Sequence, residues 1–405
     1  MTCRVTASLA GLALVSALAA GCGGARVTTA AEERDAPRPE PVRAPDVEAA
    51  EAPACEWRAT TIAPGPVMGQ SLALDARDVP HVVYTRSVQG TLVYAELRGG
   101  EWVSTELTED GSRASLVAEE GELWVSYREF ETRSLLVAHR QGEEWSHEVV
   151  ESPTDGVSAF GLETSIAAHE GTPSVAYYAR LGGGVEELRY ARPSGGAWQV
   201  ETVDGAVEDA MHNPPPLLLL GPDGAPSIVH VGTRAEEPPR LRPLLHALRG
   251  DAGWSASVIH DVSSTEVGFE PAAAVDGAGQ LHVTAHAHGS FSRERGFDSV
   301  VHAARPLDGE WAIERWEWPS HLSRVRLSFD RADRAHALSV GVGGELDRVV
   351  HSVSRGSGEW SRSVIAEGDV HGLRLAIASS GEVHALYIQN RALVHARSLG
   401  CVPSP

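Results

Sequence analysis

The sequence predicts an all-β protein, a seven-bladed β-propeller built from four-stranded antiparallel blades. Three observations lead to this prediction. A Trp recurs directly after a Gly-containing turn, short strands of alternating pattern precede each of these Trp residues, and the last unit lacks a strand that the start of the folded region supplies. Four-stranded units that repeat roughly every 50 residues are typical of propeller blades.

The recurring Trp marks the fourth, outer strand of each unit. It follows the turn in segments such as "GGEWVSTEL", "GGAWQVETV" and "SGEWSRSVI". The series consists of Trp102, Trp145, Trp198, Trp254, Trp311 and Trp360.

The other three strands precede each Trp in a constant order. The third strand appears as "LVYAELR" or "VVHAARP", and the second as "HVVYTR" or "HALYIQ". Before these comes an aliphatic strand that a tight turn closes, as in "SLALDARDVP". Alternation bounded by Gly, Asp and Pro indicates strands rather than helices. We expect the innermost strands near residues 71, 115, 165, 217, 272, 326 and 374.

The two ends of the folded region complete one blade. The last unit, "LRLAIASSGEVHALYIQNRALVHARSLGC", has three strands and no Trp, whereas the first segment, "CEWRATTIA", is an outer strand carrying Trp57. The N-terminal strand is therefore predicted to close the ring, which removes an exposed edge. Cys55 and Cys401 begin and end these adjacent strands, so we expect a disulfide between them in an oxidising compartment.

Residues 1–21 are predicted to be a lipoprotein signal peptide, because a short apolar run follows Arg4 and small residues precede Cys22. "LAAGC" resembles the bacterial lipobox, with Ala19 where that motif usually has Leu, and the resemblance implies that Cys22 is acylated. Plain secretion is the alternative. We expect export and an outer-membrane lipoprotein that faces the periplasm or the cell surface.

The segment 22–54 is rich in Ala, Pro and Glu and is predicted to be a disordered tether, which leaves residues 55–405 for the propeller. The formal net charge of −21 argues against a nucleic acid or an anionic membrane surface as partner. We expect membrane contact only through the lipid anchor, no cofactor, and a monomer.

The repeat resembles bacterial sialidase-like, or BNR-type, propellers. The Asp-box of that family, Ser-x-Asp-x-Gly-x-x-Trp, is degenerate in this sequence and keeps only its Gly and Trp. The resemblance implies a Tyr nucleophile with an acidic partner, an Arg trio that binds the substrate carboxylate, and an Asp acid/base. Tyr84, Tyr127, Tyr177 and Tyr387 instead share one position of the second strand, which indicates that they build blades.

Histidine is abundant, with 18 residues, but eight of them follow the repeat. Structural roles are predicted for the His residues that share one position of the second or third strand: His81, His282, His336, His384, His246, His302, His351 and His395. The "HAH" at 286–288 places two imidazoles on one strand face, but a metal site needs a third ligand, so none is predicted.

Candidate binding residues lie where the repeats differ. The turns between strands one and two, and between three and four, are short, whereas the loops at the other ends are long and irregular. In a propeller the long loops share one face, and binding residues concentrate on such loops. The candidates are Arg374, Arg324, Glu163, Glu270, His212, Arg128 and Arg293.

Arginine on this face of an acidic protein suggests an acidic or polar ligand, because guanidinium groups bind carboxylates in a bidentate manner. The leading hypothesis is a non-catalytic module that binds a protein or a glycan. A sialidase-like hydrolase or a polysaccharide lyase that uses Arg with Glu163 or Glu270 at the channel mouth is the alternative. A purely structural envelope protein is the third possibility.

Overall fold

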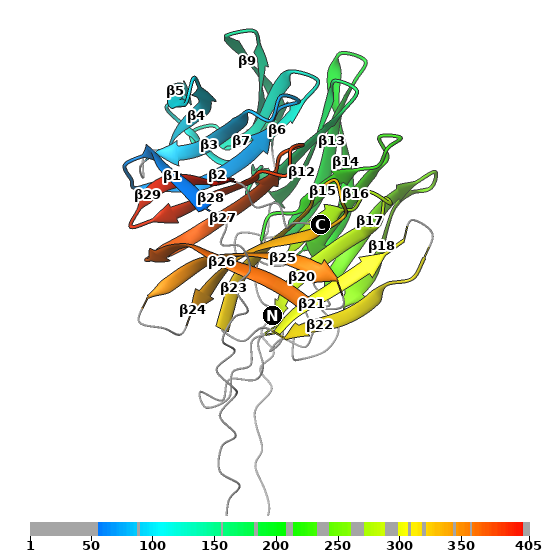
Figure 1. Cartoon of the computed structure of the whole chain (residues 1–405). Helices are drawn as coiled ribbons and strands as arrows, with labels where there is room; N and C mark the ends of the chain where they lie inside the picture. The colour runs from blue at the N-terminus through cyan, green and yellow to red at the C-terminus, as the bar shows by residue number, and fades with distance from the viewer. Residues whose placement is uncertain are drawn as a thin grey trace, which may run out of the picture. The chain divides into compact units, whose positions relative to one another are not determined.

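The computed structural model describes residues 56–86, 90–154, 157–181, 185–207, 214–232, 243–260, 271–287, 299–306, 309–317, 321–342, 346–356 and 359–399. These residues form seven four-stranded antiparallel blades in a propeller ring, as the sequence predicted (Figure 1). The described part of the chain contains no helix long and apolar enough to span a membrane. The predicted signal peptide, the tether, Cys22, Cys55 and Cys401 lie outside the described residues.

Each blade is a meander whose first strand lies innermost, against the first strands of neighbouring blades. Blade 1 contains β2 (Val67–Leu74), β3 (Pro80–Arg86), β4 (Thr91–Arg98) and β5 (Glu101–Thr108); blade 2 contains β6 (Gly111–Glu119), β7 (Glu122–Glu129), β8 (Leu135–Gln141) and β9 (Glu144–Glu151); blade 3 contains β11 (Thr164–His169), β12 (Thr172–Leu181), β13 (Glu186–Ser194) and β14 (Ala197–Val207). A short strand, β10 (Val157–Ala159), also pairs with β12.

The remaining blades follow the same plan. Blade 4 contains β15 (Leu217–Leu220), β16 (Pro226–Val231), β17 (Leu244–Gly250) and β18 (Gly253–His260); blade 5 contains β19 (Ala272–Val275), β20 (Leu281–Ala287), β21 (Ser299–Arg305) and β22 (Ala312–Glu317); blade 6 contains β23 (His321–Phe329), β24 (Ala335–Val342), β25 (Asp347–Gly356) and β26 (Glu359–Gly368). Blade 7 contains β27 (Val370–Ile377), β28 (Val383–Gln389), β29 (Ala392–Leu399) and β1 (Glu56–Ala63).

Blade 7 confirms the predicted ring closure. Its strand order is β1-β29-β28-β27, so the N-terminal strand is the outer strand of the last blade. Trp57 pairs with Ser398, and Glu56 pairs with Leu399. These pairs bring the chain next to Cys55 and Cys401 together, although the two cysteines are not among the described residues.

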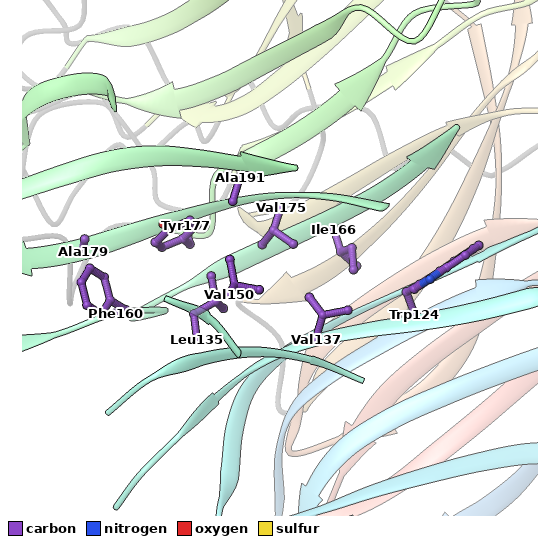
Figure 2. Close-up of a cluster of buried hydrophobic side chains, with 10 residues drawn as sticks. All are labelled: Trp124, Leu135, Val137, Val150, Phe160, Ile166, Val175, Tyr177, Ala179 and Ala191. Carbon is purple, nitrogen blue, oxygen red and sulfur yellow. The ribbon is translucent and has the colours of Figure 1, made fainter. Parts of the chain in front are cut away.

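The hydrophobic core lies between blades. A separate apolar cluster fills each of the seven junctions, including the one between blades 7 and 1. Figure 2 shows the cluster between blades 2 and 3, where Leu135 and Val137 of β8 face Ile166, Val175 and Tyr177. Because the middle strands of each blade are covered on both faces, their residues are buried almost without a break, as in β3 and β28.

The recurring Trp seals these junctions. The ring of Trp102 packs edge-on against His395 of the preceding blade at 5.1 Å, and Trp145 packs in the same way against Tyr94 at 5.1 Å. Trp254 meets Tyr190 at 5.3 Å, again across a junction. The Trp that recurs in the repeat is therefore a packing residue between blades.

A polar pair joins the second and third strands inside six of the blades. His336 Nδ1 lies 3.0 Å from His351 Nε2, and His384 Nδ1 lies 3.0 Å from His395 Nε2. The other pairs are His81–Tyr94, Ser174–Tyr190, Ser227–His246 and His282–His302. Burial lowers the pKa of His351 and of His395 to about 3, so both are neutral at pH 7.

An Asp in the short turn holds two of these pairs in place, those of blades 5 and 6. One Asp330 oxygen accepts the backbone N–H of Ala332 (2.9 Å) and of Arg334 (3.0 Å), and the other lies 3.2 Å from His336 Nε2. Asp276 and Asp75 organise their turns in the same manner. An Asp side chain that bonds the backbone two residues ahead defines such turns, and in blades 5 and 6 it also fixes the imidazole behind it.

Candidate functional site at the channel mouth

A pocket of about 290 Å³ lies inside the ring of innermost strands, toward the long-loop face. All seven blades contribute to its wall. The lining residues come from the middle of β2, β6, β23 and β27, and from the starts of β11, β15 and β19 or the segments just before them. We refer to this part of the central channel as the channel mouth.

Four innermost strands carry a β-bulge beside this pocket. The pairing register shifts between Met68 and Ser71, and the equivalent shift occurs in β6, β23 and β27. Each bulge contains a residue with positive φ: Gly69 (+60°), Arg113 (+57°), Arg324 (+58°) and Gly372 (+67°). Bulges re-aim side chains and are frequent near binding sites.

Two of those positive-φ residues are arginines. A non-glycine side chain in this left-handed region costs roughly 1–2 kcal/mol, and such strain concentrates at functional sites. Blades 1 and 7 use Gly at the same position, so the backbone shape itself does not require an arginine. Arg113 and Arg324 therefore point to a role beyond folding.

One register of the pocket wall carries Ser in some innermost strands and Arg in others. Ser71, Ser115 and Ser165 each accept a backbone N–H from the next innermost strand, at 3.2, 3.3 and 3.1 Å. Arg326 and Arg374 occupy this same register in blades 6 and 7. Blades 1 to 3 thus use small hydroxyls to link their strands, whereas blades 6 and 7 place guanidinium groups in the pocket wall.

Backbone carbonyl groups orient these two guanidinium groups. Arg326 Nε donates to the carbonyl of Leu373 at 3.1 Å, which links blade 6 to blade 7. Arg374 donates to the same carbonyl at 2.7 Å. Leu373 is fully buried, so its carbonyl is held in place by the surrounding packing and orients both arginines.

Arg113 and Glu163 form an ion pair on the opposite side of the mouth. The Glu163 side chain is only 12% exposed, and burial lowers the pKa of Arg113. Thr164 donates to the Arg113 carbonyl at 2.7 Å and holds the bulge. The described lining residues include three arginines and one carboxylate, so this part of the lining carries a net positive formal charge.

Blades 4 and 5 give the pocket an apolar side. Pro214, Pro215 and Pro216 precede β15, and Pro271 precedes β19 in the same position. Leu217, Ala272 and Ala273 complete this wall. The mouth therefore presents guanidinium groups on one side and a proline surface on the other.

More arginines lie between blades 2 and 3, next to this mouth. Burial lowers the pKa of Arg128, and the nearby charges of Arg113, Arg133 and Arg180 lower it further. The Arg128 guanidinium lies 5.5 Å from the Phe130 ring centre, and its buried Nε has no hydrogen-bond partner. Arg180 is held by Glu186, with Nε 2.8 Å from Oε1.

The structure brings some of the residues predicted from sequence together. Glu163 and Arg374 line the pocket, Arg128 lies in the adjacent arginine cluster, and Arg324 is in the bulge of β23 without lining the pocket. Glu270, His212 and Arg293 lie outside the described residues. Arg113 and Arg326 were not predicted from the sequence. Arg326 occupies the register of the candidate Arg374, and Arg113 occupies the bulge position of the candidate Arg324.

No protein-family model matches the sequence, and no curated protein matches it either. Among solved structures, a protein of unknown function from Dyadobacter fermentans is 12% identical with a TM-score of 0.50, over 86% of this chain and 99% of that one. The polysaccharide lyase Uly1 is 10% identical with a TM-score of 0.50, over 84% and 91%. The Hadza microbial sialidase Hz136 is 16% identical with a TM-score of 0.47, over 79% and 76%. At these identities the likeness shows the fold alone.

Proposed function

We propose that the channel mouth binds an anionic saccharide and that the protein is a non-catalytic glycan-binding module. The observation that carries this proposal is the convergence of Arg113, Arg326 and Arg374 on a pocket whose other side is built from proline and alanine. Planar guanidinium groups recognise carboxylates and sulfates by paired hydrogen bonds. A uronic acid or a sialic acid carries such a group on a sugar ring.

The negative net charge of the whole chain supports the choice of an anionic ligand for this pocket. With a formal net charge of −21, most of the surface repels anions. A positive pocket in an acidic protein selects an anionic ligand at that place only. The bound group would be held by arginines that backbone carbonyls already orient, which reduces the entropy lost on binding.

The apolar wall supports a sugar rather than a bare anion. Ligand sites combine apolar lining with a few placed polar groups and usually enclose about 300–1,000 Å³. The mouth, at about 290 Å³, is at the lower end of that range and suits one sugar ring. The C–H face of a pyranose would pack on Pro216 and Pro271 while its acidic group faces the arginines.

The test is binding of the purified protein to an array of uronate-terminated, sialylated and matched neutral glycans, followed by calorimetry with the best acidic ligand. Charged contacts of this kind contribute roughly 2–5 kcal/mol when buried, so Arg326→Gln or Arg374→Gln should weaken binding at least tenfold. Arg348→Gln is the matched control, because Arg348 is 55% exposed and pairs with Glu367 on an outer part of blade 6. Equal loss in all three variants, or none in the first two, would contradict the proposal.

The same experiment separates binding from catalysis. Glu163 is the carboxylate that lines the described pocket, and the hydrolase or lyase alternative would use it. If the bound oligosaccharide is cleaved, and if Glu163→Gln stops cleavage while binding persists, the protein is an enzyme. Capture of a protein ligand by the long-loop face, with no glycan bound, would favour the protein-binding form of the hypothesis.

We also propose that the chain is exported and anchored through acylated Cys22. The proposal rests on the apolar segment before Cys22 and on the lipobox-like "LAAGC". Cys22→Ser should release the protein from the membrane fraction, since two or more acyl chains are what make such anchoring stable. A mutant that still sediments with membranes would rule out this anchor.

A Cys55–Cys401 disulfide remains a prediction for the exported protein. Pairing of Glu56 with Leu399 supports it, because the two cysteines are sequence neighbours of this last ladder. Closing so long a loop would stabilise the fold by about 5 kcal/mol in the chain-entropy model, less any strain. Mass spectrometry of the oxidised protein without reductant should detect the linked peptides, and two free thiols would refute the bond.

A further inference from the structure

A second and larger cavity, of about 540 Å³, lies on the opposite, short-turn face between blades 1 and 2. It is lined by the first turn of blade 1, the ends of β4 and β8, and the turn around Gly121. Gly99, Gly121 and Gly142 form its rim, and a Cβ at any of them would meet nothing within 4 Å. The cavity is therefore open to solvent between its glycines.

A chain of buried polar groups forms one wall. The Tyr94 hydroxyl lies 2.6 Å from His81 Nδ1, donates to Glu96 at 3.1 Å and accepts from Arg140 at 2.7 Å. Glu96 also accepts from Arg140 Nη1 at 3.1 Å. Burial lowers the pKa of His81, so its imidazole is neutral at pH 7.

The polar pair at this site differs from its counterparts in blades 5 and 6. His282 Nε2 lies 3.1 Å from Asp276 and His336 Nε2 lies 3.2 Å from Asp330, which are hydrogen-bond distances. In blade 1 the same distance, from His81 Nε2 to Asp75, is 3.6 Å. His81 Nε2 and Arg140 Nε are both buried without a hydrogen-bond partner.

The short turns at two other junctions are joined directly. Asp78 accepts the backbone N–H of Ser379 at 2.8 Å across blades 7 and 1, and Asp333 accepts the N–H of Gly277 at 2.6 Å across blades 5 and 6. Between blades 1 and 2 the cavity separates the two turns. A junction whose described turns are separated by a cavity, and which leaves buried polar atoms unsatisfied beside that cavity, indicates a place for a ligand.

The chemistry of the wall defines that ligand. The carboxylates of Asp75, Glu96 and Glu143 face the guanidinium groups of Arg77, Arg98 and Arg140, so the cavity has balanced charge and alternates acceptors with donors. A hydroxyl is the group that donates and accepts at once. Val79, Leu97 and Leu123 add an apolar surface. We propose that this cavity is a second carbohydrate site, specific for a neutral sugar with adjacent hydroxyl groups.

This proposal is independent of the anionic site at the channel mouth and is tested with separate variants. The full-length protein is titrated calorimetrically with the methyl glycosides of glucose, galactose, mannose and fucose at about 5 mM, enough to saturate a site with a Kd below about 1 mM. At least one of them should bind. Arg98→Gln and Glu143→Gln, whose side chains are 46% and 75% exposed, should each weaken it at least tenfold without unfolding the blade.

Two controls make the outcome decisive. Arg249→Gln removes an equivalent Arg–Glu pair between blades 3 and 4, where Arg249 contacts Glu201 at 2.8 Å, and it should leave sugar binding unchanged. Arg374→Gln should also leave it unchanged while it weakens acidic ligands. Failure of all four glycosides to bind, full binding by Arg98→Gln, or loss in Arg374→Gln would overturn the second site.

Discussion

The two ends of the innermost strands differ in how they use polar and charged residues. At the short-turn end, Asp75, Asp276 and Asp330 each close a tight turn, and Asp276 and Asp330 also anchor an imidazole. At the channel-mouth end, the strands bulge at residues of positive φ, and two of these are arginines rather than glycines. Charged residues of positive φ occur at both ends, in the short turns at Asp78, Glu120 and Asp333 and in strand bulges at Arg113 and Arg324. The short-turn end uses its polar groups to close turns and pair imidazoles, whereas the bulges place arginines beside the channel pocket.

The difference shows which polar residues belong to the fold and which do not. A side chain that recurs at one register and finds its partner inside the blade, such as His336, stabilises the repeat. Arg326 in place of Ser71 departs from the residue type that recurs at this register, although it too links its blade to the next one, through the Leu373 carbonyl. Function should therefore be sought at departures from the repeat, including the blade 1–2 cavity where a repeated contact is lengthened.

Acidification should have the largest effect, because it acts on every buried imidazole at once. Burial lowers the pKa of His351 and His395 to about 3 and that of His246 to about 4, whereas each is about 6.5 in the unfolded chain. The unfolded state then binds more protons below pH 6.5, so stability is fully present above pH 6.5 and is lost as the pH falls toward 4. Urea unfolding measured from pH 7.5 to pH 4 should show a decrease of several kcal/mol.

Blade 1 shows which substitution can remove one of these imidazoles without disturbing the blade. Tyr94 occupies in blade 1 the register of His395 in blade 7, and it pairs with His81 as His395 pairs with His384. His395→Tyr should therefore fold. Its unfolding free energy should decrease less between pH 7.5 and pH 4 than that of the unmodified protein, by about the contribution of one imidazole. If the unfolding free energy of this variant falls with pH as steeply as that of the unmodified protein, protonation of His395 does not contribute to the acid sensitivity.

The next largest effect is expected from Asp330→Ala. Its carboxylate is 4% exposed and accepts from Ala332, Arg334 and His336, so the substitution leaves several buried donors unpaired. The expected loss is about 3–5 kcal/mol of unfolding free energy. Asp223→Ala is the control in blade 4, where an exposed carboxylate accepts only the Ala225 N–H at 3.0 Å, and the loss should be below about 1 kcal/mol. Equal losses by urea unfolding would show that the Asp–His link does not stabilise the blade.

The fold was predictable because its signal repeats. Each Trp after a turn, together with three alternating segments before it, placed the innermost strands close to their observed positions, and Trp57 identified the closing strand. Packing explains this success: the same junction is built seven times, so the same residue types recur at the same spacing.

The site was less accessible from sequence for a physical reason. Glu163 and Arg374 were chosen for their place on the long-loop face, whereas Arg113 and Arg326 were passed over although Arg326 occupies the register of Arg374. The bulges that set these positions have no mark in the residue pattern. The cavity between blades 1 and 2 was invisible, since its turn "DARD" resembles the turns of other blades. A lengthening of one contact from 3.1 or 3.2 Å to 3.6 Å leaves no mark in the residue pattern.

The smallest of these effects tests the strain at the channel mouth directly. Gly69 and Gly372 have nearly the same φ, +60° and +67°, but different surroundings. A Cβ on Gly69 would find Thr85 Oγ1 at 3.7 Å, whereas one on Gly372 would overlap the side chain of Gln70, which is 3% exposed and donates to the Gly372 carbonyl. Gly69→Ala should therefore cost only the left-handed conformation, about 1 kcal/mol.

Gly372→Ala should cost that amount and also displace Gln70, for about 2–4 kcal/mol in total by urea unfolding. The comparison bears on the arginines, because Arg113 and Arg324 adopt the same backbone conformation at equivalent bulges in blades 2 and 6. A measurable cost for Gly69→Ala, where space is free, means that both arginines are held at the expense of stability. If Gly69→Ala is neutral, the bulge imposes no strain, and the backbone argument that assigns Arg113 and Arg324 a role beyond folding fails.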